Sequence, residues 1–159
     1  MTNPLPQPRA CLTINDITLG QKFSKNYSVS YEMVKKFAEI SGDWNPVHHD
    51  AAFAATTIFK QQIAHGMISV AQFSGIFGMD LPGLGAIWLQ QSATFRAPVY
   101  LDQPYTAVAE VVGIDADKNT VIFKTYCTDA SGKVVLEGEG HLKPIPQKVK
   151  DAMGQKPAA

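Results

Sequence analysis

The chain has 159 residues, a length typical of one domain with a substantial buried core. Hydrophobic residues make up 45% of it and charged residues 18%, which excludes a chain that is disordered beyond its ends. Fourteen Lys and Arg balance fourteen Asp and Glu, so the zero net charge gives no footprint for nucleic acid, and no apolar run approaches the roughly 18 residues of a membrane span.

The first ten residues, MTNPLPQPRA, are rich in proline and lack an apolar segment, so we interpret residues 1–10 as a flexible arm and not as a signal peptide. The two cysteines, Cys11 and Cys127, form no C-x-x-C pair and favour two reduced thiols. We therefore expect a cytoplasmic protein. A single domain is expected at 11–145, followed by a polar tail at 146–159 that can hold a short helix.

Residues 22–30 alternate in character and predict a strand. Ser30 is a suitable N-cap for a helix over 31–41, and Gly42 is a natural stop for it. In that helix one stripe is apolar and predicts the buried face. The stripe contains Met33, Phe37 and Ile40, with Val34 and Ala38 beside it.

Asp50 can cap a second short helix at 51–59. A third helical segment, at 66–79, is apolar nearly all round. A helix without a polar face is typical of a buried helix, and fourteen residues span about 21 Å.

After this helix the pattern changes to strands, at 86–95, 104–114, 119–128 and 133–143. Turn residues separate the last three, which therefore form an antiparallel meander. With the strand at 22–30, the economical packing wraps this antiparallel sheet around the long buried helix. The expected fold class is therefore α+β.

The stretch SGDWNPVHHD, residues 41–50, carries the titratable groups that attract most attention. Asp43 and His48 are five positions apart and would lie on different faces of a straight helix. Pro46 disfavours helix at Asn45, so we interpret the stretch as a loop in which an Asn-Pro turn can bring the two side chains together. On spacing alone, a turn-closing aspartate beside a surface imidazole is the simpler interpretation.

Other polar groups near this stretch have simpler roles. We expect His49 and Asp50 to be capping or solvent-exposed residues. A metal site made from His48, His49 and Asp50 is disfavoured, because adjacent histidines project in different directions and no spaced third ligand follows. We therefore expect no metal.

Three segments together resemble the MaoC-like, or type 2, (R)-specific enoyl-CoA hydratases, a family with the hot-dog fold. They are SGDWNPVH at 41–48, AHGM at 64–67 and FRAPV at 95–99, and the resemblance spans about residues 20–143. One departure follows FRAPV: the Gly-Asp turn usual in the family is replaced by YLDQP at 100–104. That difference leaves the chemistry intact but weakens any transfer of substrate preference.

The resemblance implies reversible hydration of a trans-2-enoyl-CoA to an (R)-3-hydroxyacyl-CoA. Asp43 and His48 would act as an acid–base pair on one water, with the role of each left open. Gly66, at the start of the long helix, would supply an amide N–H to the thioester oxygen. Substrate-binding roles are expected for Asn45, Ser74 and Phe77.

No cofactor is implied, because the chemistry is proton transfer and coenzyme A is part of the substrate. Lys60, Arg96 and Lys124 are candidates for its phosphates, and His65 is expected to support the loop and not to react. A homodimer or higher oligomer is expected, since open sheet edges need protection. The alternatives are a 3-hydroxyacyl-carrier-protein dehydratase, a thioesterase, or a noncatalytic acyl-CoA-binding subunit.

Overall fold

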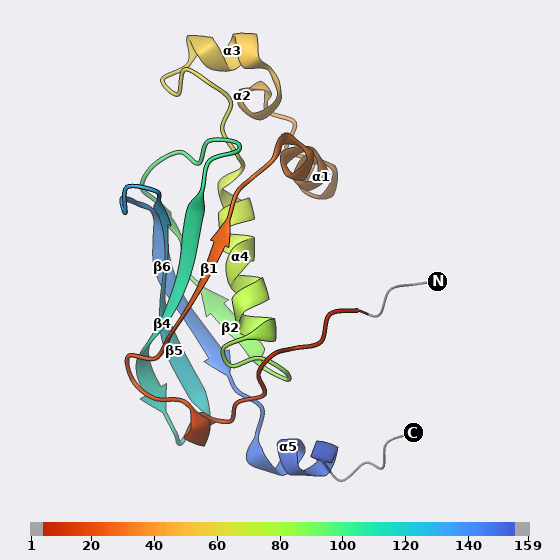
Figure 1. Cartoon of the computed structure of the whole chain (residues 1–159), viewed down its shortest axis with the longest axis vertical. Coiled ribbons are helices and arrows are strands. Elements are labelled where there is room, and N and C mark those ends of the chain that lie inside the picture. Colours follow the sequence, from red (N-terminus) through yellow and green to blue (C-terminus); the bar gives the residue numbers. More distant parts are fainter. Residues whose placement is uncertain (1–4, 155–159) are drawn as a thin grey trace.

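Six antiparallel strands form one sheet in the computed structural model, which describes residues 5–154. The spatial order is β1-β4-β5-β6-β2, and β3 also pairs with β6. Long helix α4 packs along one face of this sheet (Figure 1), as predicted for the α+β hot-dog fold. The strands are β1 (Lys22–Tyr27), β2 (Ile87–Gln91), β3 (Thr94–Phe95), β4 (Tyr105–Asp115), β5 (Thr120–Asp129) and β6 (Val134–Lys143).

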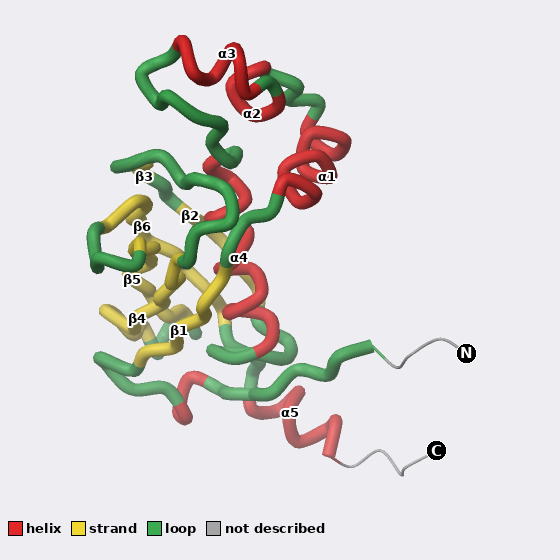
Figure 2. Tube along the Cα trace, turned by 45° about the horizontal axis from the view of Figure 1, so that its top comes forward, coloured by secondary structure: helices red, strands yellow, loops and turns green. Residues whose placement is uncertain are grey.

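The helices occupy the two ends and one face of the sheet. Helices α1 to α3 gather at one end, where α4 also begins, and both views show them beyond the strands (Figures 1 and 2). The helical elements are the 3-10 turn η1 (Ile14–Asp16) and helices α1 (Tyr31–Ser41), α2 (Pro46–His49), α3 (Ala51–Thr56), α4 (Gly66–Met79) and α5 (Gln147–Gly154). Among the described residues, no helix combines the length and apolarity needed to cross a bilayer.

The core lies between α4 and the sheet. Phe73, Ile76 and Phe77 of α4 are at most 2% exposed and meet buried side chains of the strands, such as Val111 and Phe123. The opposite stripe of α4 is exposed in the single chain and consists of small or apolar residues. Its members are Met67, Ala71, Ser74 and Gly78.

The buried face of α1 differs from the predicted stripe. Val34 and Ala38 are fully buried, whereas Met33 is 37% and Ile40 84% exposed, and only Phe37 of the predicted stripe packs against the core. The smaller side chains at 34 and 38 let the helix axis come close to the body of the domain. The two larger residues consequently lie on its flanks.

The single strand predicted at 86–95 is divided into β2 and β3, and both pair with β6. Ser92 lies at the division and exchanges two hydrogen bonds with the backbone of Glu139. A Cβ atom placed at Gly138 would collide with the Ser92 carbonyl. The split therefore depends on a glycine far along the chain that no local pattern reveals.

The N-terminal segment is attached where the structure describes it. The N–H groups of Arg9 and Ala10 donate to the carbonyl of Met79, at 2.7 and 3.1 Å, and so occupy the end of α4. Residues 1–4 of the predicted arm and 155–159 of the predicted tail lie outside the described residues. Cys11 and Cys127 are free thiols, as expected.

Candidate active site

The site begins where α1 ends. Gly42 adopts a left-handed conformation with φ 77°, which glycine tolerates without a steric penalty, and its N–H closes the helix on Ala38. The side chain of Asn45 then accepts a hydrogen bond from the N–H of Val47 at 3.2 Å. Local sequence therefore reverses the chain between the two groups of interest.

The prediction of a loop over the whole of 41–50 is wrong in one part. Helix α2 forms there, from Pro46 to His49. Proline fits the first helical position, where its missing N–H is not needed and its fixed φ suits the helix. Asn45 is the N-cap of α2, and Asp50 caps α3 as predicted, accepting from the N–H of Phe53 at 3.0 Å. This turn places His48 inside the molecule.

Asp43 and His48 converge, as predicted. His48 Nε2 lies 3.8 Å from Asp43 Oδ2, with the imidazole buried and the carboxylate half exposed. His48 Nδ1 lies 2.8 Å from the carbonyl of Ile63, and a carbonyl only accepts, so Nδ1 carries the hydrogen. The lone pair of Nε2 therefore faces the carboxylate. The separation exceeds a direct hydrogen bond and suits a contact bridged by one water molecule.

The environment of His48 favours its neutral form. Burial lowers the pKa of His48 below its ordinary value, and the neighbouring ring of His65 lowers it further. The bond to Ile63 and the charge of Asp43 act in the opposite direction but do not reverse the shift. A neutral imidazole with a free Nε2 lone pair can accept a proton.

Gly66 is the first residue of α4, and the side chain of the N-cap residue His65 makes no capping hydrogen bond. Its N–H belongs to the first turn, where helical geometry supplies no partner and the helix dipole is positive. The ring of Phe95 covers the α-carbon of Gly66 so closely that a Cβ there would lie 2.5 Å from Phe95 Cε1. A larger residue at position 66 would therefore require the Phe95 ring to move.

Asp43, His48 and Gly66 line one cavity of about 500 Å³. Its remaining wall is mostly apolar, with Ser69 and Arg96 among the polar exceptions. Apolar contributors include Phe37, Phe59, Ile63, Val99, Val135 and Leu136. An apolar cleft with a few convergent polar groups is the usual form of a small-molecule site.

None of the three predicted substrate-binding residues lines this cavity. Asn45 caps α2 beside it and is absent from its lining. Ser74 lines a second groove, of about 520 Å³, between α4 and β2. Phe77 is 2% exposed and packs in the core against Trp88 and Phe123.

Of the three basic residues considered for phosphate contacts, Arg96 alone lines the cavity, and it is paired with Glu137 at 2.7 Å. Lys124 lies over the ring of Tyr126 on β5. Lys60 is exposed on the turn after α3, outside the cavity lining.

Two polar residues of the cavity carried no substrate-contacting role in the sequence analysis. His65 adjoins Gly66 in the quoted AHGM segment, and its position there is the signal that could have drawn attention to it. Ser69 follows Gly66 by three residues, a spacing that puts both on one face of α4. Its hydroxyl accepts a hydrogen bond from Tyr27 at 2.9 Å.

Asp43, His48 and His65 present potential ligand atoms within 4.8 Å of one another, a set different from the one considered in the sequence. His65 Nε2 lies 2.9 Å from the carbonyl of Asp43 and must carry a hydrogen to make that bond. This nitrogen is therefore not free to bind a cation. Without it, Asp43 and His48 offer two ligands, fewer than the three or four protein ligands usual for zinc.

Comparison with known proteins gives consistent results. Residues 15–132 match the family model for the MaoC-like domain. The chain is 45% identical over 124 residues to an (R)-specific enoyl-CoA hydratase from Rhodospirillum rubrum, an alignment that covers 78% of this chain and 85% of that protein.

Two solved structures resemble most of the chain. The (R)-hydratase from A. caviae superposes with a TM-score of 0.79 and 38% identity, covering 81% of this chain and 98% of that one. The unliganded R-hydratase PhaJ1 from Pseudomonas aeruginosa gives a TM-score of 0.80 and 38% identity, covering 85% and 86%.

Proposed function

Since the chain belongs to the MaoC-like family, we propose that it is an (R)-specific enoyl-CoA hydratase that adds water to trans-2-enoyl-CoA. The observation that carries this proposal is the approach of Asp43 Oδ2 and His48 Nε2 to 3.8 Å in a mostly apolar cavity that also contains Gly66. The similarity to (R)-specific enoyl-CoA hydratases over most of the chain supports it.

In the proposed reaction, one water molecule lies between the two side chains. His48 Nε2 takes one of its protons while the oxygen bonds to C3 of the enoyl group. Asp43 accepts a hydrogen bond from the other O–H of the water and so orients it, and this hydrogen stays on the oxygen. The π electrons move to the thioester oxygen, and the imidazolium of His48 then returns its proton to C2. Because oxygen and proton both come from the water's side, addition is syn.

The thioester oxygen carries enolate charge during this step and needs a hydrogen-bond donor. The N–H of Gly66 is suited to that role, because it lies at the positive end of α4 and the N-cap side chain of His65 does not bond there. Proton transfer and this donor complete the chemistry, so we propose that no metal or redox cofactor takes part. Coenzyme A enters as part of the substrate.

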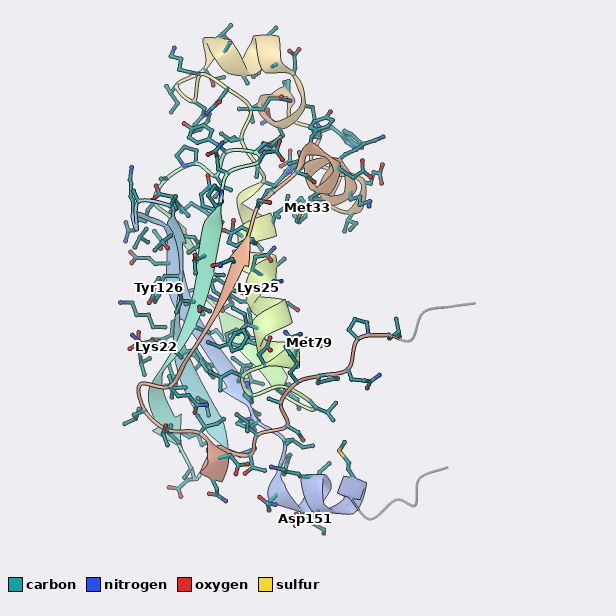
Figure 3. The ribbon with its side chains drawn as sticks, viewed as in Figure 1. Lys22, Lys25, Met33, Met79, Tyr126 and Asp151 are labelled. Carbon is teal, nitrogen blue, oxygen red and sulfur yellow. The ribbon has the colours of Figure 1, made fainter. Side chains whose placement is uncertain are left out.

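We also propose that the protein is a homodimer joined at β2. The outer strand β1 carries Lys22 and Lys25 (Figure 3), and such charges discourage pairing between sheets. At the opposite edge β2 carries no charge, and Ile87 and Leu89 are 58% and 51% exposed.

The groove between β2 and α4 supports the same interface. It is lined by Met67, Ala71 and Ser74 on the exposed stripe of α4, and it shares Phe37 and Met67 with the first cavity. A second copy placed there would protect both the strand edge and the apolar groove. Ser74, for which a substrate-binding role is predicted, would then lie at the boundary between the two subunits. Cytoplasmic location stays a prediction, checked by cell fractionation.

Incubation with crotonyl-CoA tests the proposed activity. The enoyl absorbance should fall without release of free thiol, and the product should be the (R)-3-hydroxybutyryl thioester. Release of thiol would instead indicate a thioesterase. Turnover of carrier-protein thioesters alone would indicate a dehydratase of fatty-acid synthesis. Tight binding of crotonyl-CoA without turnover would contradict the proposal that the protein is an enzyme and would indicate an acyl-CoA-binding subunit.

A further inference from the structure

His65 lies in the cavity wall beside the acid–base pair but has no part in the proton transfers above. It is 3% exposed, at the residue that precedes α4. Its Nε2 lies 2.9 Å from the main-chain carbonyl of Asp43, so Nε2 carries the hydrogen and donates it. The bond joins the start of α4 to the turn that holds the carboxylate.

The ring of His65 is also stacked on the ring of His48. Their centroids are 3.8 Å apart and their planes differ by 32°. Phe37 packs against His65 as well, at 5.0 Å. His65 is thus fixed by contacts from α1 and α2, and in turn it limits where the ring of His48 can lie.

Each imidazole is held in one tautomer by a backbone carbonyl. Ile63 accepts from Nδ1 of His48, and Asp43 accepts from Nε2 of His65. His65 therefore contacts both members of the pair, the backbone of one and the ring of the other. A single side chain can in this way set the distance between the carboxylate and the Nε2 lone pair.

We propose that His65 is a positioning residue of the hydratase site, which holds the Asp43 turn through its Nε2–H and the His48 ring through stacking. This inference rests on the proposed function and assigns to His65 the geometry on which the shared water depends. Correct placement of reacting groups contributes strongly to rate, and a shift of about 1 Å can cost roughly 100-fold.

The Nδ1 atom of His65 helps to distinguish a positioning role from a purely structural one. His65 Nδ1 is buried and has no hydrogen-bond partner among the described residues. Burying a polar atom without a partner is unfavourable, so an aromatic hydrocarbon in this space would remove a destabilising feature. If His65 served only stability, its replacement by phenylalanine would be harmless to turnover.

Two matched variants test the proposal. His65→Phe keeps a ring for stacking but has no donor, whereas His65→Gln can place an amide N–H near the position of Nε2. We expect kcat of His65→Phe to fall roughly 10- to 100-fold, with KM within about threefold. Its melting temperature should change little, because the lost hydrogen bond to Asp43 offsets the removal of the unpaired Nδ1. His65→Gln should retain kcat within about fivefold of the wild type.

Wild-type kcat in His65→Phe would overturn the proposal, and so would equal losses in both variants accompanied by lower melting temperatures. A measurement on the unmodified protein is independent of variant folding. Nitrogen-15 NMR of the histidine rings at neutral pH should show the Nε2–H tautomer for His65 and the Nδ1–H tautomer for His48. The Nδ1–H tautomer at His65 would contradict the proposal whether or not crotonyl-CoA is hydrated.

Discussion

The carbonyl of Ile63 accepts the Nδ1–H of His48 at 2.8 Å and thereby directs the lone pair of Nε2 toward Asp43. Ile63 is fifteen residues away along the chain, in the segment that leads into α4. The base is thus oriented by a backbone group, which a change of side chain at position 63 does not remove.

The first prediction concerns pH. Because His48 must be unprotonated to act and burial lowers its pKa, kcat/KM should rise with pH with a midpoint below about 6.5, the ordinary histidine value. The groups that face His48 are Asp43, His49 and His65, and the midpoint reports their combined effect. The profile is measured by initial rates with crotonyl-CoA.

A suitable control is His141→Gln, since this partly exposed histidine bonds Glu139 on β6 and lies outside the cavity lining. Its acid limb should coincide with that of the wild type. A midpoint at or above the ordinary value in the wild type would contradict the assignment of His48 as a buried base.

The same shift has a consequence for stability. The unfolded chain binds a proton at His48 at a higher pH than the folded chain does, so between the two pKa values unfolding takes up protons. The contribution of His48 is therefore present above about pH 6.5 and is lost as the pH falls through its folded pKa. The free energy of unfolding, measured by chemical denaturation, should fall less in His48→Asn than in the wild type as the pH is lowered from about 6.5 through the folded pKa of His48. Parallel plots of this free energy against pH for the two proteins would contradict the prediction.

Gly66→Ala tests the close approach at the start of α4. The added methyl would meet the ring of Phe95, which is 53% exposed and can move, so stability should change by no more than about 1 kcal/mol. The methyl and the displaced ring would disturb the thioester position, so kcat/KM should fall about 100-fold. Gly75→Ala on the same helix meets only the flexible end of Lys25, at 3.4 Å, and should retain activity. Wild-type kcat/KM in Gly66→Ala would contradict a close approach of the thioester to Gly66.

The proposed dimer predicts a mass twice the 17.3 kDa of the chain by light scattering. Leu89→Lys places a charge on the exposed edge of β2 and should shift the protein toward monomer, because an unpaired charge in a buried interface is unfavourable. Leu19→Lys, at a similarly exposed leucine before β1, should leave the mass unchanged. Equal effects of both substitutions would refute an interface at β2.

Sequence predicted those parts of the fold that local signals determine. Ser30, Gly42 and Asp50 end or begin helices where expected, because caps act within a few residues. The convergence of Asp43 and His48 was likewise foreseen from the Asn-Pro turn and the family resemblance. Helix α2 was missed because proline was interpreted as a breaker and not as a first helical residue.

Features set by distant contacts could not be predicted. A helix that is apolar all round gives no sign of which side faces a cavity, so Ser74 was chosen although Ser69 lines the site. Burial of Val34 and Ala38 in place of Met33 depends on how closely α1 approaches the domain. His65 was expected to support the loop, but its partners come from other segments and could not be named from the sequence.

The central claim is that Asp43 and His48 act together on one water, and a double-variant cycle in kcat tests it most directly. Asp43→Asn retains an oxygen for the N–H of Asn45, and His48→Asn can retain an N–H toward Ile63, so both should fold. Each single variant should lose roughly 10²- to 10⁴-fold in kcat, and the double variant no more than the worse single. Losses that multiply, or a double variant that still turns over crotonyl-CoA at the wild-type rate, would contradict the account.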